Sequence, residues 1–352
     1  MSPMAKVFKL DRKALNVPRA VAVVVILALV VIVLEVIDEP QYIITVVFAV
    51  LLAGLSDPGG DFGNGATRLG GFALLGALLT LLGFGIGARA WELVVLAAFV
   101  VTLLGGLAVK FGLHRFVSGL LLNTWFLIAI TLPVAYKLDR VTTHAWSQAL
   151  AWLAGCALWI AFAGILWLVR GRGPRPAPFP EIPGDISPRQ LTRPIILFAL
   201  IRAIAIAIAV AIPFGLRLPE ADWMPIATLV AMVPSLEQSM LVSEQRLAGA
   251  VLGALVAAVL LLTVHNKHVL EVAVVVILTL GVAIHGVNYA LYTAAIAAAV
   301  LIAIDLPHPT NLSHEALRVL YTFLGVGLAV LVMLLATQLG KRAAKAPAPQ
   351  TT

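Results

Sequence analysis

The chain has 352 residues, 61% of them apolar and 12% charged, with a formal net charge of +7. Soluble globular proteins are usually about 45–50% apolar and about 25% charged, so this composition excludes an ordinary soluble protein. The apolar residues form uncharged runs of the length that spans a hydrocarbon core, roughly 17–25 residues. We therefore expect a polytopic α-helical protein embedded in the lipid bilayer.

The basic residues gather in three segments, which indicates membrane topology rather than nucleic-acid binding. These segments are the N-terminus, the stretch 170–193 and the residues after 340. Lys and Arg near the ends of membrane spans favour the cytoplasmic side. We expect both termini and the central stretch to be cytoplasmic, with an even number of spans in each half of the chain and no nucleic-acid partner.

About six apolar segments precede the central stretch. In chain order they lie near residues 18–37, 42–55, 68–88, 93–109, 116–136 and 146–169. Residues 1–169 are thus predicted to form a first transmembrane unit. The single cysteine, Cys156, lies inside the last of these segments, where we expect an inert packed thiol.

The stretch 170–193 is rich in Pro and Arg, and Pro disrupts a regular helix interior, so we expect an extended cytoplasmic linker. About six more apolar segments follow, near residues 194–214, 223–234, 247–264, 269–284, 289–304 and 316–339. They predict a second transmembrane unit over residues 194–340. Residues 341–352 are predicted to be a disordered cytoplasmic tail.

The two units share charged anchors and small residues in the same order. Arg68 and the Leu-Gly-Gly-Phe-Ala after it resemble Arg246 and the Leu-Ala-Gly-Ala-Val after it, 178 residues later. Arg19 similarly precedes Arg202 by 183 residues. This pattern predicts an all-α bundle of two parallel tandem repeats of about six transmembrane helices each, related by an axis along the membrane normal. Chance similarity between apolar segments is the alternative.

The second segment of each unit is unusually short. Residues 42–55 are bracketed by Pro40 and Pro58, and residues 223–234 contain Pro225. Both are shorter than the roughly 20 residues that cross a bilayer. Short or Pro-interrupted segments at matching places in two repeats are typical of a transport site, although ordinary kinked helices also fit the pattern.

A polar stretch follows each short segment and ends at Arg68 or Arg246, where we expect a long helix to begin. The N-terminus of a helix offers free N–H groups and a positive dipole end, and an arginine adds a planar pair of donors for carboxylates. These features predict an anion site to which Ser235 and Gln238 also belong. The alternative is that both arginines only set the topology.

Arg202 lies about eight residues into the seventh segment, whereas Arg19 lies nearer the start of the first. An arginine near the bilayer centre costs roughly 2.5–3.5 kcal/mol on insertion scales, so we expect Arg202 to face a cavity or a partner. Snorkelling to the interface is the alternative. Asn123 and Tyr289, in the corresponding fifth and eleventh segments, are further candidates to line a path for substrate.

His285 is the candidate for proton coupling, because histidine titrates near neutral pH, although a hydrogen-bonded histidine at a helix end fits equally. The loop Asp57–Gly65 is predicted to be a flexible turn. His265, Lys267 and His268 are expected in an outer loop without a metal site. Motifs for phosphate binding, hydrolysis and zinc proteolysis are absent from the sequence, so we expect no enzyme activity and no cofactor.

The stretch from Trp223, WMPIATLVAMVPSLEQSMLVSEQRLAGAVLGALVAAVL, resembles the fusaric acid resistance and aromatic acid exporter superfamily. The shared pattern is a Trp that opens a short apolar helix, a polar turn, and an Arg with small residues that open a long helix. The Arg-Ala-x-Ala of Arg202–Ala205 is similar to the family's first helix. In the first half, Tyr42 takes the place of the Trp, and the resemblance covers most of the chain.

This resemblance implies a secondary transporter of a bacterial inner membrane that exports small organic anions, such as aromatic carboxylates, and is driven by the proton gradient. We expect the chain to differ from the longer exporters in lacking their sizeable cytoplasmic domain. The oligomeric arrangement, including a homo-oligomer, and the need for a partner protein therefore stay open. Plant aluminium-activated malate channels look like distant relatives. A passive organic-anion channel and a non-transporting membrane scaffold therefore remain alternatives.

Overall fold

The computed structural model describes residues 10, 15, 17–87, 90–135, 144–173, 190–219, 223–232, 236–264, 266–284, 287–305 and 312–345. All regular elements in these ranges are helices. The first half contains six α-helices: α2 (Val17–Val36), α3 (Ile43–Ser56), α4 (Phe62–Ile86), α5 (Trp91–Leu107), α6 (Leu113–Ala135) and α7 (Ala145–Val169). Short 3-10 turns, η2 (Pro40–Tyr42) and η3 (Ala108–Phe111), precede α3 and α6.

The second half also contains six described α-helices: α8 (Arg193–Leu216), α9 (Trp223–Ala231), α10 (Leu236–Thr263), α11 (Lys267–Ile284), α12 (Tyr289–Asp305) and α13 (Leu312–Lys345). The expectation of about six helical segments in each half is thus confirmed for the described residues. The expectation that α3 and α9 are short is confirmed as well, because they have 14 and 9 residues. Pro225 lies in the first turn of α9, where a missing N–H costs no hydrogen bond.

Six of the described helices are long and apolar enough to cross a membrane, namely α4, α5 with η3, α6, α7, α8 and α11. Their outer faces carry exposed large apolar side chains, such as Leu74 and Leu78 on α4 and Val272 and Val276 on α11. Such faces are costly in water and favourable in lipid. The chain is therefore a multi-pass membrane protein.

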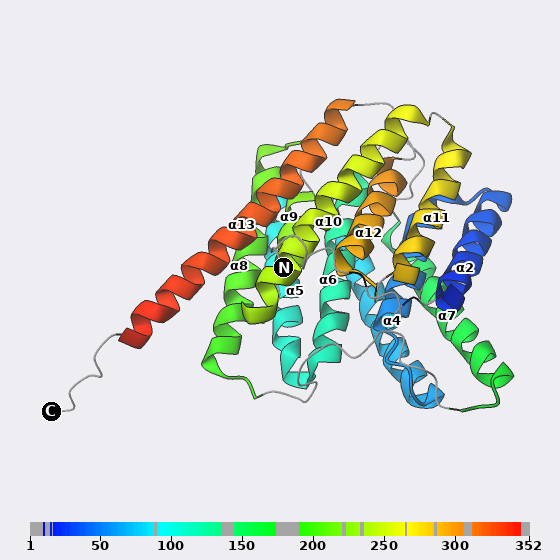
Figure 1. The fold of residues 1–352 in the computed structure, drawn as a ribbon, viewed down its shortest axis with the longest axis horizontal. Coiled ribbons are helices and arrows are strands. Elements are labelled where there is room, and N and C mark those ends of the chain that lie inside the picture. The colour runs from blue at the N-terminus through cyan, green and yellow to red at the C-terminus, as the bar shows by residue number, and fades with distance from the viewer. Residues whose placement is uncertain are drawn as a thin grey trace.

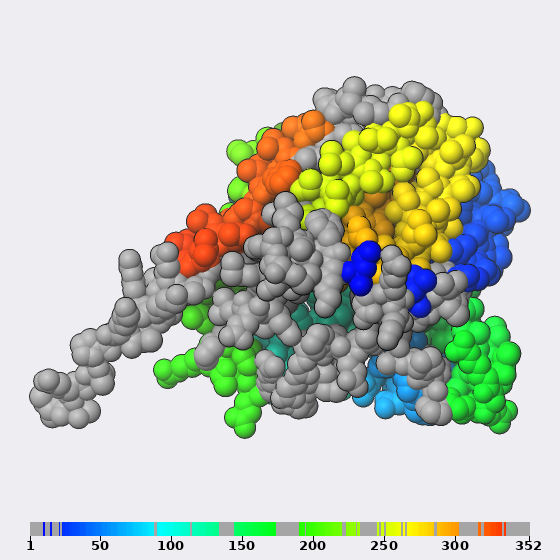
Figure 2. Space-filling view, in the orientation of Figure 1, coloured from blue at the N-terminus to red at the C-terminus, as the bar shows by residue number. Residues whose placement is uncertain are grey.

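The helices pack in a pattern that recurs in both halves (Figure 1). Within the first half, α4 packs on α6 and α3 packs on α7; within the second half, α10 packs on α12 and α9 packs on α13. Two seams join the halves: α5 packs on α8, and α2 packs on α11. Figure 2 shows α11 and α2 side by side on one face, and in Figure 1 the end of α13 projects beyond the other helices.

Glycines allow the closest helix pairs to approach. A Cβ on Gly83 or Gly87 of α4 would overlap atoms of Ala129 or Ile130 on α6. A Cβ on Gly249 or Gly253 of α10 would likewise overlap α12. Both glycine pairs thus allow close helix approach, as expected for small residues at membrane helix interfaces.

Four helix ends differ from the sequence-based boundaries. α4 and α10 begin at Phe62 and Leu236, several residues before the arginines where we expected them to start. α13 continues to Lys345, so the predicted disordered tail is wrong for residues 341–345, while residues 346–352 lie outside the described residues. Lys267 and His268 belong to the first turn of α11 rather than to a loop. In α10, α11 and α13 hydropathy marks only the apolar part of the helix, whereas Glu, Gln, Lys and Arg continue it readily.

Candidate functional site

Arg202 lies in the middle of α8 and is only 1% exposed. Its neighbours along the helix, Ala199, Ala203 and Ile206, are also fully buried. The guanidinium carbon lies 5.4 Å from the centroid of the Phe116 ring on α6. This geometry suits a cation–π contact, and the expectation that Arg202 faces protein rather than lipid is confirmed.

The seam between α5 and α8 places Arg202 between the two halves of the chain. A Cβ on Gly106 of α5 would lie 2.9 Å from the Cβ of Ala199, one turn before Arg202 on α8. At the other end of the seam, Gly215 faces the ring of Trp91, so the two helices run antiparallel. A charge buried in such a seam must be compensated by protein groups or by a ligand.

Asn123 lies next to the same seam, on α6. It is 1% exposed, and its Nδ2 donates a 2.9 Å hydrogen bond to Oγ1 of Thr102 on α5. Its Oδ1 has no hydrogen-bond partner among the described residues. The structure therefore places two of the predicted site residues, Arg202 and Asn123, in the region where α5, α6 and α8 meet.

The other predicted residues do not join this region. Arg68 is exposed on α4, and Tyr289 is half-buried at the start of α12 with its ring 5.9 Å from that of Tyr292. For Arg19 on α2 and Gln238 and Arg246 on α10, the structure describes the backbone position only. The predicted Ser235 and the proton-coupling candidate His285 lie outside the described residues.

The predicted placement of Arg68 and Arg246 at helix N-termini is wrong. Arg68 lies six residues after the start of α4 and Arg246 ten residues after the start of α10. At the start of α4, Asp61 accepts the 2.9 Å hydrogen bond from the Asn64 N–H, so a carboxylate already caps these free donors. Arg68 is therefore not adjacent to the N-terminus of α4.

Residues 197–332, which run from α8 to α13, match the family described as fusaric acid resistance protein-like. The match covers less than half of the chain. The resemblance inferred from Trp223 and Arg202 is thus confirmed over these residues, and the match suggests a transporter-like membrane protein. Comparison with curated proteins and with solved structures gave no match.

Before the matched residues, the short helix α3 has a buried polar group at each end that its sequence did not predict. At its start, Oγ1 of Thr45 donates to Oε1 of Gln148 on α7, and Nε2 of Gln148 donates to the Gln41 carbonyl at 3.1 Å. At its end, Asp57 is 6% exposed. Gln148 could have been noticed in the sequence, because it is a polar amide near the start of an otherwise apolar span.

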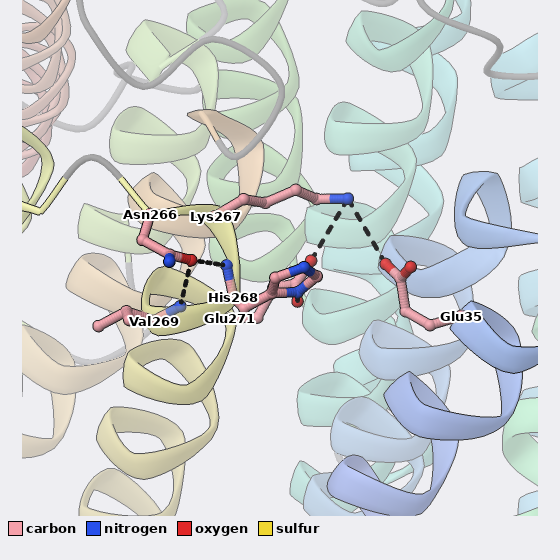
Figure 3. A network of polar contacts seen from close by, with 6 residues as sticks. All are labelled: Glu35, Asn266, Lys267, His268, Val269 and Glu271. Carbon is pink, nitrogen blue, oxygen red and sulfur yellow. Dashed lines mark hydrogen bonds and ion pairs between the residues drawn. The ribbon is translucent and has the colours of Figure 1, made fainter.

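A third polar group joins α11 to α2 (Figure 3). α11 belongs to the matched residues, whereas α2 lies before them in the sequence. Nζ of Lys267 lies 3.5 Å from a carboxylate oxygen of Glu35 and 3.4 Å from one of Glu271. Nδ1 of His268 lies 3.1 Å from the other oxygen of Glu271. The Lys267–Glu35 pair joins α11 to α2, whereas the two pairs with Glu271 lie within α11. Because Lys267 and His268 are exposed, each pair contributes little to stability.

Proposed function

We propose that the chain is a secondary transporter that exports small organic anions, with aromatic carboxylates as the substrate class. The observation that carries this proposal is the fully buried Arg202, in the seam between the two halves and inside the stretch that matches the fusaric acid resistance protein-like family. Its planar donor pair suits a carboxylate, and the ring of Phe116 beside it offers an aromatic surface. Asn123 supplies the neighbouring hydrogen-bonding group, while Arg19, Arg68, Arg246 and Tyr289 would attract the anion along its path.

We further propose that the two halves are parallel tandem repeats, with residues 1–169 and 194–340 as the transmembrane units. The support is the recurrence of helix contacts: α4 with α6 and α3 with α7 in the first half correspond in helix order to α10 with α12 and α9 with α13 in the second. The seam of α5 with α8 likewise has its counterpart in the seam of α11 with α2. A site at Arg202 would then lie between repeats, where transporters of this kind bind substrate.

In this proposal the protein lies in a bacterial inner membrane, as the resemblance to the exporter family implies, with both termini cytoplasmic. The basic N-terminal, central and C-terminal segments support this orientation. Inward movement of protons drives outward movement of the anion, and the chain is not an enzyme. Its partners are the lipid bilayer and the organic anion, without nucleic acid, and the arrangement is compatible with a homo-oligomer.

The test is efflux of a radiolabelled aromatic carboxylate from cells that express the wild type, Arg202→Lys, Arg202→Gln or Arg246→Ala at equal membrane abundance. We expect Arg202→Gln to lower the rate about 10–100-fold, the effect of losing a hydrogen bond to a charged group. Arg202→Lys keeps the charge but loses the planar donor pair, so it should recover only part of the rate. Arg115→Gln is the matched control, because Arg115 is an exposed arginine on α6.

Unchanged efflux in both Arg202 variants would remove the proposed anion site. Planar-bilayer recordings then separate the exporter from the passive channel. Unitary anion currents through the purified protein would favour the channel, whereas transport that requires a proton gradient favours the exporter.

A further inference from the structure

Asp57 is a buried carboxylate in the turn that joins α3 to α4. Its Oδ1 accepts the Gly59 N–H at 2.9 Å, and its Oδ2 accepts the indole N–H of Trp159 on α7 at 3.2 Å. The Trp159 ring is itself fixed in place, since a Cβ on Gly54 would lie 3.2 Å from it. Both carboxylate oxygens are thus held by donors that suit the ionised form.

The contact with Trp159 places Asp57 well inside the depth of the bundle. Trp159 lies ten residues before the end of α7 at Val169, which corresponds to about 15 Å along the helix axis. Phe62, at the start of α4, stacks on Trp167, which lies nearer the end of α7, with ring centroids 5.1 Å apart. The turn therefore lies alongside a membrane span, and an ionisable residue at such depth is a functional candidate.

A short series of contacts connects Asp57 with Arg202. The neighbour of Asp57, Ser56, shares a 2.6 Å hydroxyl–hydroxyl hydrogen bond with Ser118 on α6. Two residues before Ser118, Phe116 carries the ring that lies against the Arg202 guanidinium. A displacement of the end of α3 would thus also move the first turns of α6 and disturb the cation–π contact between Phe116 and Arg202.

The charged side chains on the elements around Asp57 are at the surface where the structure describes them. Asp61 caps α4, and Arg68 lies farther along α4; both are exposed. On α6, Arg115 is exposed and follows His114, and α7 ends beside the exposed Arg170. Among the carboxylates that the structure describes, Asp57 is the one that is buried and lies alongside a membrane span.

We propose that Asp57 is the proton-carrying group of the transport cycle, an inference that rests on the proposed proton-driven export. The carboxylate takes a proton when it is reached from the outer side and releases it to the cytoplasmic side, while the organic anion moves outward. Each cycle therefore moves one proton inward at Asp57, and no covalent bond other than the carboxyl O–H forms or breaks.

The geometry also explains how proton binding can move a helix. Protonation removes the negative charge that holds the N–H groups of Gly59 and Trp159, so both hydrogen bonds lose the strength that comes from charge. The end of α3 is then less firmly held to α7. Gly59 and Gly60 have φ values of 67° and 69°, a backbone region that glycine adopts without strain, so the turn can follow this movement.

The test uses the purified full-length chain in liposomes with radiolabelled phthalate, a dianion that crosses protein-free bilayers slowly. One assay measures transport driven by an imposed pH gradient, and the other measures phthalate exchange without a gradient. We expect the gradient to stimulate the wild type about tenfold, within the usual range of coupling between sites. Asp57→Asn should retain exchange and lose this stimulation, whereas Asp57→Glu should retain part of it.

Asp61→Asn is the matched control, because Asp61 is an exposed carboxylate in the same turn; its gradient stimulation should equal that of the wild type. Full gradient stimulation in Asp57→Asn would overturn the proposal. A wild type that exchanges phthalate without any effect of the gradient would overturn it as well, while leaving the anion site intact. A wild type that moves no phthalate would overturn the exporter and, with it, the role of Asp57.

A measurement on the wild type covers the case in which Asp57→Asn does not fold. Dicyclohexylcarbodiimide modifies protonated carboxyl groups in apolar surroundings, and mass spectrometry locates the modified residue. We expect modification at Asp57 that abolishes gradient stimulation. Complete modification of Asp57 with full gradient stimulation would contradict the proposal.

Discussion

The large aromatic side chains of the first half pack together because a glycine makes room for them. Trp125 and Trp152 are both fully buried, with ring centroids 4.8 Å apart, and the Trp125 indole N–H donates to Thr80 Oγ1 at 2.8 Å. Gly76 on α4 lies directly against the Trp152 indole nitrogen, so that a Cβ there would overlap the ring. This cluster holds α4, α6 and α7 together beside the short helix α3.

Gly76→Ala should therefore lower stability by about 1–3 kcal/mol, the usual cost of overpacking a dense core. Gly71→Ala on the same helix is the matched control, because a Cβ at Gly71 has no atom within 4 Å. That control should be neutral or stabilising by up to about 1 kcal/mol through helix propensity. Thermal unfolding of both purified variants in detergent checks this difference, and equal melting temperatures would contradict it.

The sequence predicted one of the two buried charges and missed the other, for a physical reason. Arg202 lies inside an apolar run, where an arginine is costly and therefore conspicuous. Asp57 lies at the boundary of a run, next to Pro58 and two glycines, where an Asp is ordinary turn chemistry. Its burial depends on the position of Trp159, 102 residues away in the chain, and hydropathy along the sequence contains no such information.

At the scale of elements, the two short helices are attached to their neighbours in different ways. α3 is joined to α7 by polar contacts at both ends, through Thr45 with Gln148 and through Asp57 with Trp159. α9 lies against α13, where Thr228 Oγ1 donates to the Gly325 carbonyl at 2.9 Å. Short helices in a membrane leave backbone groups that neighbouring protein must satisfy or cover. Just before α3, the Gln148 amide does this for the Gln41 carbonyl.

Thr45→Val tests the attachment at the start of α3. The substitution keeps the side-chain shape but removes the donor to Gln148, so unfolding should become easier by about 1 kcal/mol, as for other hydrogen bonds between membrane helices. Thr67→Val is the control, because the exposed Thr67 donates to the Gly63 carbonyl of its own helix. Denaturant titration in mixed micelles measures both, and an equal loss in the control would contradict the role of the Thr45–Gln148 contact.

Hydropathy located the apolar part of each element, and errors appeared where polar residues continue a helix. α10 begins at Leu236, and its first ten residues are largely polar. Lys267 was assigned to a loop because it is charged, although it opens α11. The loop predicted to be a flexible turn after α3 is instead held by hydrogen bonds of Asp57 and Asp61. These contacts are local, but their formation depends on where neighbouring helices lie.

At the scale of the whole molecule, the sequence predicted the class and the number of helical segments but not their pairing. All the membrane helices are apolar on most faces, so periodicity does not distinguish the partner of one from that of another. The seams of α5 with α8 and of α2 with α11 emerge only in the structure. The first seam contains Arg202, which is why the proposed path for the anion runs between the halves rather than through either one.

The most direct test of this account is phthalate efflux from liposomes that contain the purified wild type, Arg202→Gln or the control Arg115→Gln. The account predicts that phthalate leaves wild-type and Arg115→Gln liposomes at similar rates, both well above the rate from protein-free liposomes. Arg202→Gln should reduce the protein-dependent rate about tenfold or more. Equal rates for the wild type and Arg202→Gln, or no efflux above protein-free liposomes, would contradict it.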